Sequence, residues 1–160
     1  MATTVEYEMV YDAPAESVAA MLSDPAFREE VCQEMRAISH EVHIDGDASG
    51  KKVRIEMVQP TEGVPAVAAK IVGSTTEIVQ EEVWSSPTDG KITVTIPGKP
   101  GEMSGTATLV EADGVTREQV RMDIKVKIPL VAGKIEGVLA KVLRSALKAE
   151  ERVGRKYLAG

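Results

Sequence analysis

The fold of this chain is decided in residues 120–139, VRMDIKVKIPLVAGKIEGVL, where one hydrophobic period replaces another. Before Pro129, apolar and charged residues alternate, as they do in a half-buried β-strand. After Pro129, apolar residues recur at the spacing of an amphipathic helix, which we expect from about Leu130 to Leu158. A long apolar stripe is unstable in water, so this helix should pack against a sheet. The expected stripe comprises Val131, Ile135, Val138, Leu139, Val142, Ala146, Val153 and Tyr157, flanked by Leu143 and Leu147.

Strand patterns occupy most of the chain before this helix. Alternation over residues 4–11 predicts a first strand, and prolines start two short helices, at 15–22 and about 25–35. Alternating patterns then resume as six strands, with turns at 46–50, 86–90 and 112–114. A short helix is expected over 64–73, bounded by Pro65 and Gly73. The predicted order is therefore strand, two helices, six strands and one long helix.

Length and composition indicate one globular domain over residues 1–160. Hydrophobic residues make up 43% and aromatic residues 3%, so aliphatic and methionine side chains must fill the core. The net charge of −6 disfavours nucleic acid as a partner, because such proteins carry a concentrated positive surface. The single cysteine, Cys32, excludes an internal disulfide. Neither a signal peptide nor a membrane-spanning run is visible, so we expect a cytoplasmic protein.

Three stretches carry a resemblance to a known superfamily. They are residues 64–66, VPA; Pro100-Gly101 with Gly105-Thr106 and Leu109; and residues 128–136, IPLVAGKIE. With the order of elements, they resemble the START-like (SRPBCC) superfamily, which includes START lipid-transfer domains, birch-pollen-type allergens and polyketide cyclases. Within it, the chain is similar to an actinobacterial branch known only as a domain of unknown function. It departs at Ala132-Gly133, where two glycines are expected before the lysine.

The resemblance implies an α+β helix-grip fold. In this fold a curved seven-stranded antiparallel sheet has two short helices after its first strand, and a long C-terminal helix packs across it. It also implies a hydrophobic cavity between sheet and helix. It names no substrate and no cofactor, and fold alone is a weak guide to function.

The sequence contains no complete catalytic or metal site. His40 alternates with Ile38, Val42 and Ile44, so it is a candidate acid/base or ligand anchor. The favoured alternative is a core histidine with an ordinary hydrogen bond, because buried polar groups are usually satisfied in this way. Only two histidines and one cysteine are present, which disfavours a zinc site. No cofactor is predicted, because phosphate-binding loops and dinucleotide fingerprints are missing.

The side chains expected to line the cavity come from inward-facing strand positions and from the apolar stripe of the last helix. Each of them is equally compatible with ordinary core packing. Trp84 shares its alternation with Ile78, Gln80 and Glu82, so its strand does not divide cleanly into two faces. The expected ligand-binding residues are Tyr7, Met9, Tyr11, His40, Val42, Met57, Trp84, Met122, Ile124, Ile135, Val138 and Val142.

Three functions remain open from the sequence. The leading interpretation is a non-catalytic binder or carrier of a small hydrophobic molecule, lipid or polyketide-like. The alternatives are a cyclase- or hydrolase-type enzyme that uses His40, and a protein-interaction module with a filled core. The last helix also carries an excess of lysine and arginine. This excess fits a solvated outer face, or contact with an anionic membrane.

Overall fold

The computed structural model describes residues 2–60 and 73–160, and its centre is one antiparallel sheet in the order β1-β7-β6-β5-β4-β3-β2. The strands are β1 (Thr3–Tyr11), β2 (Ser39–Asp47), β3 (Gly50–Pro60), β4 (Thr75–Trp84), β5 (Asp89–Thr95), β6 (Gly101–Ala112) and β7 (Val115–Val126). The helices are α1 (Ala15–Leu22), α2 (Pro25–Glu34) and α4 (Ala132–Ala159). The expected helix over 64–73 lies almost entirely outside the described residues.

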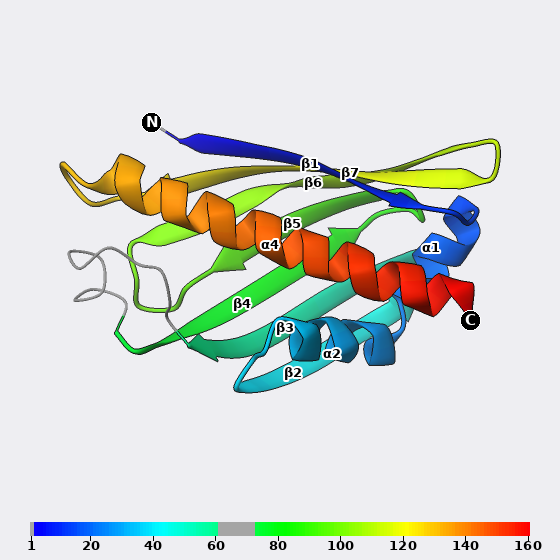
Figure 1. Cartoon of the computed structure of the whole chain (residues 1–160), viewed down its shortest axis with the longest axis horizontal. Coiled ribbons are helices and arrows are strands. Elements are labelled where there is room, and N and C mark those ends of the chain that lie inside the picture. Colours follow the sequence, from blue (N-terminus) through cyan, green and yellow to red (C-terminus); the bar gives the residue numbers. More distant parts are fainter. Residues whose placement is uncertain (1, 61–72) are drawn as a thin grey trace.

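The sheet is curved, and α4 runs along its concave side with α2 beside the C-terminal half of α4 (Figure 1). This is the predicted helix-grip arrangement, and it is confirmed. Local chemistry explains the short helices. Pro14 precedes α1 in an extended conformation, and the Asp24 side chain accepts a hydrogen bond from the Ala26 amide at the start of α2.

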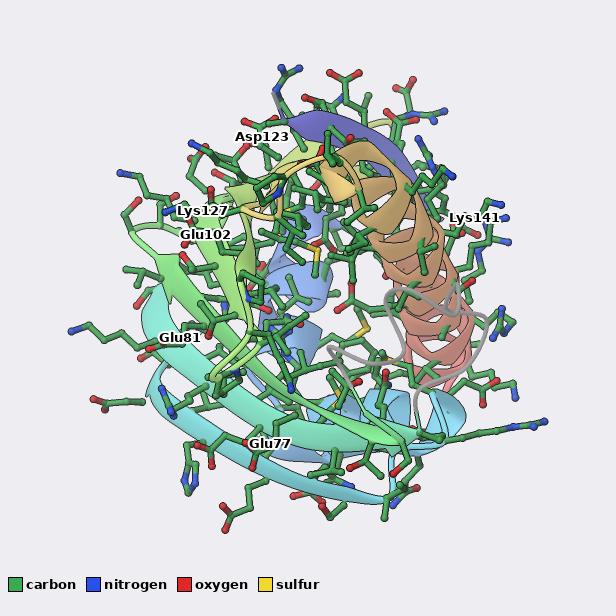
Figure 2. All side chains as sticks on the ribbon, turned by 90° about the vertical axis from the view of Figure 1, so that its left-hand side faces the viewer. Glu77, Glu81, Glu102, Asp123, Lys127 and Lys141 are labelled. Atoms are coloured by element: carbon green, nitrogen blue, oxygen red, sulfur yellow. The ribbon has the colours of Figure 1, made fainter. Side chains whose placement is uncertain are left out.

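Alternation divides each strand between the interior and the solvent. On β7, the apolar residues of the predicted face are all buried. Most charged residues of the strands take the other face, and Figure 2 shows Glu77, Glu81, Glu102 and Asp123 on the convex side of the sheet. Lys51, Glu82 and Glu118 are buried exceptions. The interior is packed mainly by aliphatic and methionine side chains, as the low aromatic content predicts.

The junction before α4 differs from the sequence expectation. Strand β7 ends at Val126 rather than Ile128, and α4 begins at Ala132 rather than Leu130. Leu130 has a φ of 70° and is fully exposed, so the backbone leaves the helical region at that residue. Glu136 fastens the helix start to the sheet, since its buried carboxylate accepts from the Val126 amide at 3.0 Å and from the Thr3 hydroxyl at 2.8 Å.

The buried face of α4 is rotated relative to the predicted stripe. Val142 is 40% exposed and Tyr157 39% exposed, although both were expected to be covered. The rotation occurs because charged residues hold inward positions. Glu136 is buried by its two hydrogen bonds, and Glu150 lines the interior, so a stripe built from apolar residues alone misses the true face. Among the described residues, no helix has the length and apolarity needed to cross a membrane.

Candidate functional site

A cavity of about 70 Å³ lies between the concave face of the sheet, α2 and the C-terminal half of α4. Most of its wall is apolar, and three methionines contribute to it. Ionisable side chains from four elements also reach it. The lining residues are Arg28, Val31, Cys32, Met35, Ile55, Met57, Gln80, Glu82, Ile92, Val94, Glu118, Val120, Met122, Leu143, Ala146, Leu147 and Glu150.

Arg28 on α2 and Glu82 on β4 form a buried, bidentate ion pair at one side of this cavity. The Arg28 Nη1 and Nη2 groups donate to the two Glu82 oxygens at 2.9 and 2.8 Å, and Arg28 Nε donates to the Leu22 carbonyl. Trp84 Nε1 and Gln80 Nε2 also donate to Glu82. Burial alone would raise the pKa of Glu82, but the Arg28 charge and these donors hold it below the usual value. Glu82 is therefore a saturated carboxylate.

Glu118 on β7 is equally buried, at 3% exposure, but it is not saturated. Its Oε1 atom has no hydrogen-bond partner within residues 2–60 and 73–160. Burial raises its pKa well above the usual value, and the nearby Glu150 and Glu82 carboxylates raise it further. Glu118 therefore binds a proton more tightly than an ordinary carboxyl does, on the wall of the cavity.

Glu150 on α4 completes the group of carboxyls. Its side chain is 14% exposed, and its Oε1 lies 3.8 Å from Arg28 Nη1, beyond hydrogen-bond distance. Burial raises the pKa of Glu150 to about 7, against the attraction of Arg28. The Glu150 and Glu82 carboxylates raise the pKa of Glu118, and Glu82 also raises the pKa of Glu150, so this group of carboxyls holds a proton more tightly than an isolated carboxyl does.

Lys51 lies on β3, directly opposite Trp84 in the β3–β4 ladder. Its ammonium stands 4.8 Å from the Trp84 ring centroid and is buried without a hydrogen bond in the described part of the chain. Burial and the Arg28 charge lower the pKa of Lys51 to about 8. Lys51 does not line the cavity, but its charge is close enough to Glu118 to oppose the rise in the pKa of that carboxyl.

A second, outer hollow of about 520 Å³ lies between α2, α4 and the end of β3. Met35 and Ala146 line both this groove and the inner cavity, so their side chains separate the two spaces. Met35 follows the last residue of α2 and has a flexible side chain. A change in its rotamer would therefore join cavity and groove.

The sequence-predicted ligand residues are dispersed in the structure. Met57 and Met122 line the cavity, whereas Val138 and Val142 line only the outer groove. Met9, Tyr11, Trp84, Ile124 and Ile135 are buried and contribute to the core or to its polar contacts. Tyr7 is only half buried, because its hydroxyl donates to Glu151 on α4. Val42 is half buried on the edge strand β2, beside Ile55 and Met57.

His40 lies apart from the cavity. It is half buried on β2, the edge strand, and lines a surface hollow together with Glu41, Arg54 and Glu56. No carboxylate of the described residues is hydrogen-bonded to it. The arrangement that would make it a cavity acid/base is therefore missing from residues 2–60 and 73–160.

The charged residues that converge on the cavity were not singled out from the sequence. Glu82 and Glu118 carry a readable signal, because each interrupts an inward-facing strand pattern with a charge: Glu82 lies between Gln80 and Trp84, and Glu118 between Thr116 and Val120. Arg28 and Glu150 carry no such signal, because charged residues are frequent on short or surface-exposed helices.

Solved structures share this architecture. The structure of the protein TTHA0849 from Thermus thermophilus superposes with a TM-score of 0.65 at 20% identity, over 95% of this chain and 97% of that one. A START superfamily protein from Mycobacterium smegmatis superposes with a TM-score of 0.57 at 18% identity, over 94% and 96% of the two chains. At these identities the likeness establishes the fold.

Sequence comparison finds relatives that are described as uncharacterised. The uncharacterised protein Rv0481c of Mycobacterium tuberculosis is 26% identical over 112 residues, which is 66% of this chain and 64% of that protein. The matched region is thus somewhat under two thirds of the relative's length. The model of a family described as a protein of unknown function, DUF2505, matches residues 6–158. The chain therefore belongs to the DUF2505 family, on a START-like helix-grip fold.

Proposed function

We propose that the protein binds a small, mainly apolar molecule in the cavity between its sheet, α2 and α4. The observation that carries this proposal is an internal space whose wall combines apolar side chains with an unpartnered, buried carboxyl, Glu118. Natural interiors rarely leave either a void or an orphaned polar atom, because both are costly. A bound molecule that fills the space and meets Glu118 would remove both costs.

The volume of the cavity bears on the size of the molecule. At about 70 Å³ it is smaller than the cavity of about 150 Å³ that holds benzene in an engineered protein. Met35, Met57 and Met122 all line it, and methionine side chains adapt their shape at low cost. The outer groove behind Met35 provides further room. We therefore expect a compact head group in the cavity, with any longer apolar part directed toward the groove.

The cavity also weighs against a protein-interaction module with a filled core. Binding, and not catalysis, is the function proposed, because the chemistry on the wall suffices to hold a ligand and the predicted acid/base, His40, lies elsewhere.

Calorimetric titration with straight-chain alcohols from butanol to octanol tests this proposal, alongside native mass spectrometry of the purified protein. We expect saturable binding that Ala146→Phe abolishes, because the larger ring occupies the wall between cavity and groove. Lys148→Phe, on the exposed side of the same helix, is the matched control and should bind normally. Binding that survives Ala146→Phe would contradict the proposed location.

A further inference from the structure

We infer that the cavity selects a ligand bearing one ammonium group on an apolar body, and that Glu118 with Glu150 holds this group. The inference rests on the proposed binding function and specifies its ligand. It arises from the hydrogen-bonding capacity and the charge of the groups at the cavity.

Among the described residues that line the cavity, the buried side-chain atom without a hydrogen-bond partner is a carboxyl oxygen. All three Arg28 nitrogens are engaged, by Glu82 and by the Leu22 carbonyl, so Arg28 is poorly placed to bind an anionic ligand. Trp84 Nε1 is engaged by Glu82, and Lys51 lies off the cavity. Glu118 Oε1, by contrast, has no partner within the described ranges, and Glu150 is beyond hydrogen-bond distance of Arg28. A ligand that donates hydrogen bonds fits this wall better than one that accepts them.

The charges lead to the same conclusion. The buried cluster contains two cations, Arg28 and Lys51, and three carboxyls, Glu82, Glu118 and Glu150. With every group ionised, the cluster carries one negative charge in excess. Buried charge must be compensated, and in the free protein a proton on the Glu118–Glu150 pair supplies the compensation. A monovalent ammonium ion could replace this proton.

Other groups around the pair leave this balance unchanged. Tyr11 on β1 contacts the same region, but burial and the carboxylates raise its pKa, so it stays neutral. Cys32 lines the cavity, and burial raises the pKa of its thiol to about 11, so it too is uncharged near neutral pH. Binding therefore exchanges one proton at Glu118 and Glu150 for one ammonium group, and the net charge of the site stays the same.

The test compares three probes of equal chain length, hexylamine, hexanol and hexanoate, by isothermal titration calorimetry near neutral pH. We expect hexylamine to bind roughly ten- to a hundredfold more tightly than hexanol, and hexanoate to bind most weakly. Titrations in buffers of different ionisation enthalpy should show up to about one proton released per hexylamine and none per hexanol.

Three variants separate this inference from the proposed function. Glu118→Gln and Glu150→Gln should each abolish most of the preference for the amine while hexanol still binds. Glu81→Gln, on the convex face of the same sheet, should retain it. Thermal melts with and without hexanol establish that each variant is folded. If hexanol and hexylamine bind equally, the ammonium inference is wrong and the cavity proposal stands. If neither binds, both are wrong.

Discussion

Glu82 and Glu118 lie at the same depth on the concave face of one sheet, each 3% exposed, yet their surroundings differ. Glu82 receives hydrogen bonds from Arg28, Trp84 and Gln80, and its pKa is lowered. Glu118 has an oxygen without a described partner, and its pKa is raised. The difference shows that burial alone does not assign a role to a charged residue. A saturated carboxylate is part of the structure, whereas an unsaturated one is available to a ligand.

The largest expected effect is the loss of stability when Glu82, the saturated carboxylate, is replaced. Glu82→Gln leaves the Arg28 guanidinium buried without its counter-ion. Breaking such a pair costs about 3–5 kcal/mol, so the free energy of unfolding should fall by that amount in urea titrations. Glu118→Gln removes a carboxyl whose charged form is disfavoured by burial and by the neighbouring carboxylates, so it should not lower the free energy of unfolding near neutral pH. A similar loss in both variants would contradict the distinction between the two residues.

The pH dependence of stability provides a second test, which concerns the two carboxyls with raised pKa values, Glu118 and Glu150. Glu118 and Glu150 bind protons more tightly in the folded chain than in the unfolded one. Between the ordinary carboxyl pKa of 4.5 and about 7, the folded state therefore holds more protons, and stability falls as pH rises. The slope should reach about 1.4 kcal/mol per pH unit for each group. Glu118→Gln and Glu150→Gln should each reduce this slope of stability against pH, whereas Glu81→Gln should leave it unchanged.

A smaller effect of opposite sign is expected from Lys51, which is a single group. Its pKa in the folded chain is lowered to about 8 from a usual 10.5. Between these values the unfolded chain binds more protons, so the free energy of unfolding should rise with pH, by at most about 1.4 kcal/mol per unit. Lys51→Met should remove this rise in denaturant titrations across the alkaline range. A rise that persists in the variant would show that another group is responsible.

The elements and their order follow from local sequence signals. Alternation along residues 115–128 predicts β7, which ends two residues earlier, at Val126. Prolines at 14 and 25 mark the starts of α1 and α2, because these signals depend on neighbours within a few residues. The change of period after Pro129 predicts α4, and the resemblance of residues 128–136 to a known superfamily led to the helix-grip fold, which the structure confirms.

The contents of the interior depend on tertiary packing. Arg28, Glu82, Glu118 and Glu150 come from α2, β4, β7 and α4, and nothing in their local sequence states that they meet. Their meeting depends on the curvature of the sheet and on the rotation of α4, which buried Glu136 fixes through Val126 and Thr3. Patterns of hydrophobicity identify which face of a strand or helix is apolar. The convergence of charged groups is instead a property of packing between distant segments, where burial makes each unsatisfied atom costly and thereby marks the site.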